Sequence, residues 1–226
     1  AKGARFMSAE SSDNWGPNGL GYYLAARMLW DPKEAERADG LIEDFLARAF
    51  GPAKEPMREF YRQLDGSEPH LLPVDQLGRM FRALDHARRL AASQPAVMAR
   101  LDDLALYAHY VALFQQYTKA KGPQRQQAFE APIRHAYRMR ETLMVHSLAL
   151  YRDLARRDKT VTIPAEAGWK VPEGKNAWKS SEPFAAAEIA KFVADGIATH
   201  PLSEMPFTPV SFSHDLVSAS PLGLPE

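Results

Sequence analysis

The stretch "AVMARLDDLALYAHYVALFQQYTKAK", residues 96–121, decides the fold class because it is long and keeps a helical hydrophobic period. Apolar residues recur every three or four positions, which places them on one face of an α-helix. They are Met98, Leu101, Leu104, Ala105, Ala108, Val111 and Ala112. Gly122 and Pro123 end this helix, and residues 124–157 repeat the period. Two long amphipathic helices joined by a short break predict an antiparallel pair.

Shorter helical patterns surround this pair. The sequence predicts further helices over residues 20–30, 38–51, 52–66, 74–93 and 182–198. We expect Gly51 to end one of them, because glycine tolerates the left-handed conformation that often follows a helix. Pro132 is expected to kink or restart the second long helix. Ser181 is expected to cap the last helix, with Glu182 and Pro183 in its first turn.

Both ends of the chain have the pattern of a strand fragment. "ARFMSA" at 4–9 and "PVSFSHDLV" at 209–217 have no local strand to pair with. An isolated buried strand cannot satisfy its backbone hydrogen bonds. We therefore predict a mainly α fold, a bundle of about seven helices with short strand fragments at both ends. The first fragment would complete a sheet that precedes this chain, and the second would begin a β domain that follows it.

The chain divides by composition into five parts. They are a strand and loop at 1–16, a helical bundle at 17–157, a Trp-containing excursion at 158–181, a terminal helix at 182–200 and a linker into a β domain at 201–226. The excursion is rich in Pro, Gly and Lys and includes a possible short strand at 160–163. We expect its two tryptophans, Trp169 and Trp178, to dock on the bundle.

Composition excludes several classes of chemistry. The 28 Lys and Arg residues balance the 28 Asp and Glu residues, which argues against a nucleic-acid binder and gives no support for an acidic-membrane binder. The absence of cysteine excludes disulfides, thiolate metal sites and cysteine nucleophiles. No apolar run is long enough to span a membrane, and no signal peptide is visible. No phosphate loop, GxSxG elbow or HExxH motif occurs, so we expect no cofactor.

Histidines give no metal-site pattern either. His135 and His146 would lie on one face of a continuous helix, too far apart along it to share a metal ion. His109 and His146 could meet across the antiparallel pair. We interpret them as histidines packed within the bundle.

Four segments carry a resemblance to a known family. They are "ESSDNWGPNGLGYYLAARMLWDP" at 10–32, "FGPAKEPMREFY" at 50–61, "HSLALYRDL" at 146–154 and "PFAAAEIAKFVADGI" at 183–197. In this order they resemble the C-terminal helical part of a bacterial family labelled domain of unknown function 4838. Its members resemble (β/α)-barrel glycoside hydrolases, and the relatives include endo-β-N-acetylglucosaminidases that act on N-glycans and α-glucuronidases. In such proteins a catalytic barrel precedes the helical domain and a β-sandwich can follow.

The resemblance implies a multidomain glycoside hydrolase-like protein of which this chain is a part. Residues 4–9 would be the last strand of a TIM-like barrel, and Glu10 would lie at its C-terminal end, where barrel enzymes keep their active sites. The rest of the barrel is missing here, together with at least one of the two carboxylates that glycoside hydrolysis normally needs. The chain alone should therefore be inactive. The resemblance further implies a glycan substrate, contacts with the barrel and the β domain, and export from the cell.

The loop after the first strand fragment supplies the candidate site residues. Glu10 could face a sugar as an acid, a base or a hydrogen-bond acceptor. Alternatively, Glu10 or Asp13 could cap the turn into the first helix. Asn14 could bind a sugar hydroxyl or serve the turn. Trp15 could offer its ring to the apolar face of a pyranose, or pack on Tyr22 or Tyr23.

A second hypothesis is a free-standing helical module that holds a protein partner. The partner would bind in a groove of the bundle or on the excursion between Trp169 and Trp178. The state of Phe6 and Met7 would discriminate between the two hypotheses. If these residues pack internally on the bundle, the module is favoured. If they are exposed, a missing domain is implied.

Overall fold

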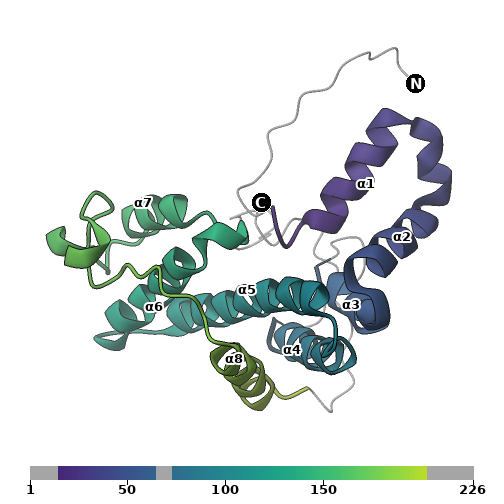
Figure 1. The fold of residues 1–226 in the computed structure, drawn as a ribbon. Coiled ribbons are helices and arrows are strands. Elements are labelled where there is room, and N and C mark those ends of the chain that lie inside the picture. Colours follow the sequence, from purple (N-terminus) through teal and green to yellow (C-terminus); the bar gives the residue numbers. More distant parts are fainter. Residues whose placement is uncertain (1–14, 65–72, 203–226) are drawn as a thin grey trace, which may run out of the picture.

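The computed structural model describes residues 15–64 and 73–202, and this part of the chain is mainly helical (Figure 1). Its eight α-helices are α1 (Gly19–Trp30), α2 (Ala38–Phe50), α3 (Lys54–Arg62), α4 (Pro73–Leu90), α5 (Pro95–Lys119), α6 (Gln124–Arg138), α7 (Ser147–Arg157) and α8 (Ala186–Thr199). The prediction of a mainly α fold is confirmed. Both predicted strand fragments, 4–9 and 209–217, lie outside the described residues.

Helix α5 is the centre of the bundle. Helices α4, α6 and α8 all pack against it (Figure 1). Helices α5 and α6 run antiparallel, since Tyr117 contacts Phe129 near the connecting turn while Leu106 lies beside His135 farther along. The predicted antiparallel pair is therefore confirmed. The main core is formed by fully or almost fully buried side chains of these helices, among them Phe81, Leu84, Leu101, Leu104, Ile189 and Val193.

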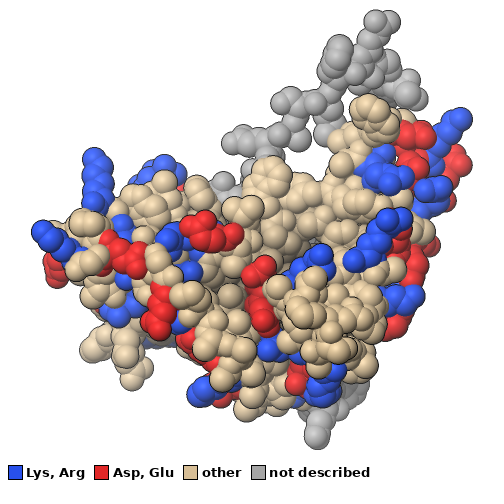
Figure 2. Space-filling model, viewed as in Figure 1, with Lys and Arg blue, Asp and Glu red and all other residues tan. Residues whose placement is uncertain are grey.

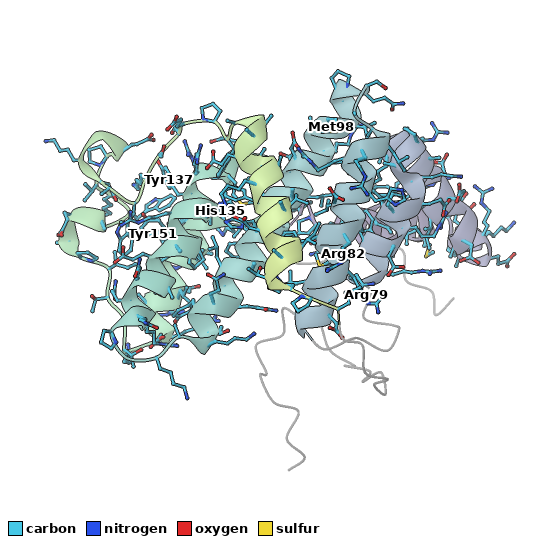
Figure 3. All side chains as sticks on the ribbon, turned by 90° about the horizontal axis from the view of Figure 1, so that it is seen from below. Arg79, Arg82, Met98, His135, Tyr137 and Tyr151 are labelled. Atoms are coloured by element: carbon cyan, nitrogen blue, oxygen red, sulfur yellow. The ribbon has the colours of Figure 1, made fainter. Side chains whose placement is uncertain are left out.

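Glycines permit the close contact between α4 and α8. A Cβ atom added at Gly196 would lie 2.5–2.6 Å from three ring atoms of the buried Phe81. Arg82 of α4 donates a hydrogen bond to the carbonyl oxygen of His200 at the end of α8, over 3.0 Å (Figure 3). Elsewhere, Gly51 ends α2 with a φ of 50°, as the sequence predicts.

The predicted helix over residues 124–157 is in fact two helices, α6 and α7. For this reason the structure has eight α-helices where the sequence predicts about seven. The break is not at Pro132, which lies inside α6. It follows Arg138, where a 3₁₀ turn at Arg140–Thr142 leads into Leu143 with a φ of 57°. Left-handed backbone cannot continue an α-helix, so the chain turns before α7 begins.

The last helix also begins later than predicted, at Ala186. Ser181 does not cap it, because the Ser181 hydroxyl and backbone N–H both donate to the carboxylate of Glu173, each over 2.5 Å. The carbonyl oxygens of Glu182 and Pro183 accept hydrogen bonds from Arg138 over 2.7 and 2.9 Å. These residues are held against α6 and so lie outside α8.

The excursion at 158–181 docks on α6 and α7 through its two tryptophans, as predicted. Trp178 is buried. Trp169 packs edge-on against Tyr137 and Tyr151. These two tyrosines lie near each other in Figure 3. Together they form a second, smaller core. Residues 160–163 form no strand, so that prediction was wrong.

Asp158 anchors the start of the excursion. Its carboxylate accepts hydrogen bonds from Tyr117 over 2.5 Å, from Arg125 over 2.6 and 2.9 Å, and from Thr160. The bonds from Thr160, followed by that from Tyr117, lower the pKa of this carboxyl group. This network ties α5, α6 and the excursion together at one end of the bundle.

The surface carries charges of both signs. Figure 2 shows Lys and Arg side chains interspersed with Asp and Glu over the visible face, with apolar and neutral surface between them. No helix among residues 15–64 and 73–202 combines the length and hydrophobicity that crossing a bilayer requires.

Candidate functional site

Of the four predicted site residues, the structure describes Trp15. Glu10, Asp13 and Asn14 lie outside the described residues, and their roles stay predictions. Trp15 precedes α1, at the junction between this helix and the loop that joins α6 to α7.

Trp15 stacks on Tyr22 and still exposes about half of its surface. The two ring centroids are 5.1 Å apart, with 27° between the ring planes, and 54% of the Trp15 surface is accessible. Tyr23 turns instead toward α2, where its hydroxyl donates to the Asp44 carboxylate over 3.0 Å. Packing on Tyr22 was one of two roles predicted for Trp15. The other role, stacking on a ligand, is compatible with it, because an indole braced on one side can contact a ring on its open side.

The loop after α6 holds the Trp15 segment in place. The backbone N–H of Gly16 donates to the carbonyl oxygen of Leu143 over 3.0 Å. A Cβ atom at Gly16 would overlap the end of the Met144 side chain, which would have to move to make room for it. The loop is itself fixed, since the Thr142 hydroxyl donates to the carbonyl oxygen of Met139 over 2.7 Å.

Leu143 is a residue that sequence reasoning missed. Among the described residues it is the one non-glycine residue with a positive φ, and it is 64% exposed. Leucine gives no sequence signal for this conformation, which usually falls to Gly, Asn or Asp. Its position could be recognised only once the contact with Gly16 was known.

Helix α1 leaves much of its apolar surface uncovered. None of its residues is buried, and Leu29 and Trp30 are 56% and 92% exposed at its C-terminal end. Figure 1 shows α1 and α2 projecting as a hairpin from the rest of the bundle. A helix rich in leucine and aromatic residues usually buries one face, so α1 has a face suited to a further contact.

The histidines meet differently from the prediction. His109 contacts His135, with ring centroids 4.9 Å apart, and not His146, which lies beyond the break after α6. The ring of His109 also stacks on Phe192 of α8. His135 is buried beside α8 (Figure 3), and its Nε2–H donates to the carbonyl oxygen of Leu106 over 2.9 Å.

Burial keeps both histidines neutral. It lowers the pKa of His135 to about 3, and the neighbouring His109 acts in the same direction. Burial likewise lowers the pKa of His109 to about 4, against the opposing effect of Asp195 and Glu188. Within residues 15–64 and 73–202, no three His, Asp or Glu side chains are grouped so that they could hold a metal ion.

A shallow groove of about 320 Å³ lies between α6, α8 and residues 177–184. The cations along it are engaged by the fold. Arg138 binds both oxygens of the Glu188 carboxylate, over 2.6 and 2.9 Å, and Lys179 donates to the carbonyl oxygens of Trp169 and Val171. The groove therefore offers less to a ligand than the exposed ring of Trp15.

None of the protein-family models, curated proteins or solved structures compared with this chain matches it. The resemblance inferred from the four sequence segments stays a prediction.

Proposed function

We propose that this chain is the helical part of a glycoside hydrolase-like multidomain protein, that it supports a preceding barrel, and that it supplies one wall of a glycan-binding site from Glu10 to Trp15. The chain alone would be inactive, because the second carboxylate needed for hydrolysis would come from the barrel.

The exposed indole of Trp15 carries this proposal. A pyranose has an apolar face of C–H groups, which packs well on an aromatic ring. Tyr22 supports Trp15 from one side, and Gly16 is tied to the loop after α6, so the ring is held in place before any ligand arrives. Such preorganisation reduces the entropy lost on binding.

The exposed face of α1 supports the structural half of the proposal. Leu29 and Trp30 expose apolar surface that a neighbouring domain could cover. Helix α1 directly follows the Trp15 loop. Leu29 and Trp30 lie at the other end of this helix, so a barrel would have to pack along the whole of α1 to reach the proposed glycan wall.

The test is a titration of the chain with N,N′-diacetylchitobiose, the core disaccharide of N-glycans. The chain has four tryptophans, and the indole N–H signal of Trp15 can be assigned by NMR with a Trp15→Phe variant. We expect this signal to shift while those of Trp30, Trp169 and Trp178 stay in place. An unmoved Trp15 signal, or equal shifts of all four, would contradict a glycan site at Trp15.

Two activity measurements complete the test. The chain alone should release no sugar from an N-glycan, and turnover by it would refute the claim that a second carboxylate is missing. In a protein that also contains the barrel, Glu10→Gln should lower the rate, because an amide can neither transfer the proton nor carry the charge. An unchanged rate would contradict a catalytic role for Glu10 and would favour the alternative that it caps the turn into the first helix.

The alternative function is a free-standing module that binds a protein partner, and the exposure of Trp30 is compatible with both functions. The two functions differ in what covers α1. A double variant Leu29→Ser and Trp30→Ser should weaken binding to a separately produced barrel domain if the first proposal is correct. If the wild-type chain does not bind that domain, the interaction module becomes the better explanation.

A further inference from the structure

Two histidine rings lie where α8 and the residues just before it meet α5 and α6. The ring of His109 on α5 stacks on Phe192 of α8, with the centroids 3.9 Å apart and 9° between the planes. His135 on α6 contacts Phe184 and Phe192, whose ring centroids are 5.2 and 5.7 Å away. The two imidazoles are 4.9 Å from each other. Aromatic side chains from α8 and its approach therefore cover both rings.

The charges around His109 come from α8. The carboxylates of Glu188 and Asp195 favour a protonated His109, but the fold already pairs both of them with cations. Arg138 binds Glu188 over 2.6 Å, and Lys191 binds Asp195 over 2.5 Å. These carboxylates therefore compensate little of the cost of placing a charge on the stacked ring.

The surroundings of His135 oppose a charge more strongly. Its Nε2–H donates to the carbonyl oxygen of Leu106, so an added proton must go to Nδ1. His109 from α5 and Arg138 from its own helix both disfavour the charged form. The groove beside His135 is lined by three cationic side chains, those of Arg134, Arg138 and Lys179. Two protons cannot enter this cluster cheaply while α8 is in place.

Of the three helices at this cluster, α8 is anchored by the fewest buried side chains. Helix α5 has eight buried residues and α6 has five, whereas α8 has three, one of which is Gly196. No side chain caps the N-terminus of α8. Helices α5 and α6 are also joined by a short turn and by the Asp158 network. If one of the three leaves the cluster alone, α8 should be the one.

We propose that α8 is an acid-released latch: protonation of His109 and His135 detaches this helix while the rest of the bundle stays folded. Release places both rings in water, where an imidazole takes up a proton near pH 6.5. It also uncovers the ring of Phe81, which lies fully buried beneath Gly196. Acid thus exposes an apolar face of the bundle that α8 covers at neutral pH.

Amide hydrogen exchange of the whole chain at pH 7 and pH 5, corrected for the intrinsic exchange rates, measures the release. Burial lowers the pKa of His109 to about 4 and that of His135 to about 3, so both stay neutral at pH 5 while α8 is docked. Between the two pH values the opening constant of the α8 amides should rise about twentyfold if one ring takes up a proton on release, and about 500-fold if both do. The buried amides of α5 should exchange more slowly than those of α8 at both pH values.

The double variant His109→Phe and His135→Gln should remove this pH dependence. The exposed histidine of α4 supplies the matched control, and His86→Gln should keep the wild-type rise. Should the double variant not fold, the single variant His109→Phe, which keeps an aromatic ring on Phe192, should lower the rise to about twentyfold.

Two results would overturn the proposal. Equal opening constants for α8 and α5 at both pH values would show that the bundle opens as one unit and that α8 is no latch. An α8 that opens equally at pH 7 and pH 5, or a His109→Phe variant with the full wild-type rise, would show that these histidines do not control the release. Neither result depends on glycan binding, so the latch and the proposed function stand or fall separately.

Discussion

Lowering the pH from about 7 to about 4.5 should destabilise the fold through His109 and His135. Both rings are neutral in the folded chain because burial lowers their pKa values to about 4 and about 3, whereas an unfolded histidine titrates near 6.5. Between these values the unfolded chain binds protons that the folded chain does not. The free energy of unfolding therefore falls as the pH falls through this window.

The magnitude follows from the size of the pKa shifts. Each pH unit below about 6.5 removes about 1.4 kcal/mol per histidine until the folded pKa is reached. By about pH 4.5 this amounts to about 2.5 kcal/mol for each ring and about 5 kcal/mol for both. The partial exposure of His109 makes this sum an upper bound. Even half of it is large, because a domain is usually stable by about 5–15 kcal/mol.

Urea denaturation at several pH values, followed by far-UV circular dichroism, measures this slope. The double variant His109→Phe and His135→Gln should flatten it. Phenylalanine keeps the stacking on Phe192, and the glutamine amide can still donate to the carbonyl oxygen of Leu106. The control His86→Gln changes an exposed histidine and should keep the wild-type slope. Equal slopes for the wild type and the double variant would refute the assignment to the buried pair.

Three further predictions concern packing and can be measured by urea denaturation. The Gly196→Ala variant should have a free energy of unfolding about 1–3 kcal/mol lower than the wild type, because its Cβ would overlap the Phe81 ring. The Gly40→Ala variant has open space around the new Cβ and should be more stable by up to about 1 kcal/mol. The reverse order would contradict the close contact of α4 and α8. The Asp158→Asn variant should lose on the order of 1–2 kcal/mol of unfolding free energy, since it weakens charge-assisted hydrogen bonds at a site partly screened by solvent. An unchanged urea midpoint would show that water satisfies the partners of Asp158 equally well. The Trp178→Ala variant should lose about 3–5 kcal/mol of unfolding free energy. Amide hydrogen exchange should become faster first in residues 158–181. An equal increase across the chain would argue against a separate second core.

The sequence could predict the elements whose signals are local. The apolar period of residues 96–121 identified α5, and the short Gly122–Pro123 break implied an antiparallel partner, because a short connection leaves the next helix little choice. Gly51 marked the end of α2 for an equally local reason, its freedom to adopt a positive φ. The two tryptophans of the excursion could be expected to dock, since large aromatic side chains are costly to leave in water.

The features that only the tertiary structure decided depend on partners far apart in the sequence. Arg138 holds the carbonyl oxygens of Glu182 and Pro183, which delays the start of α8. The contact of Gly16 with Leu143 lies at the loop where the helix expected over 124–157 divides. Trp15 could be named as a candidate from the sequence, but its support by Tyr22 and its neighbour Leu143 could not. Hydrophobic period reports which face of a segment is buried, whereas the place where a backbone leaves its helix depends on hydrogen-bond partners that the folded chain alone brings together.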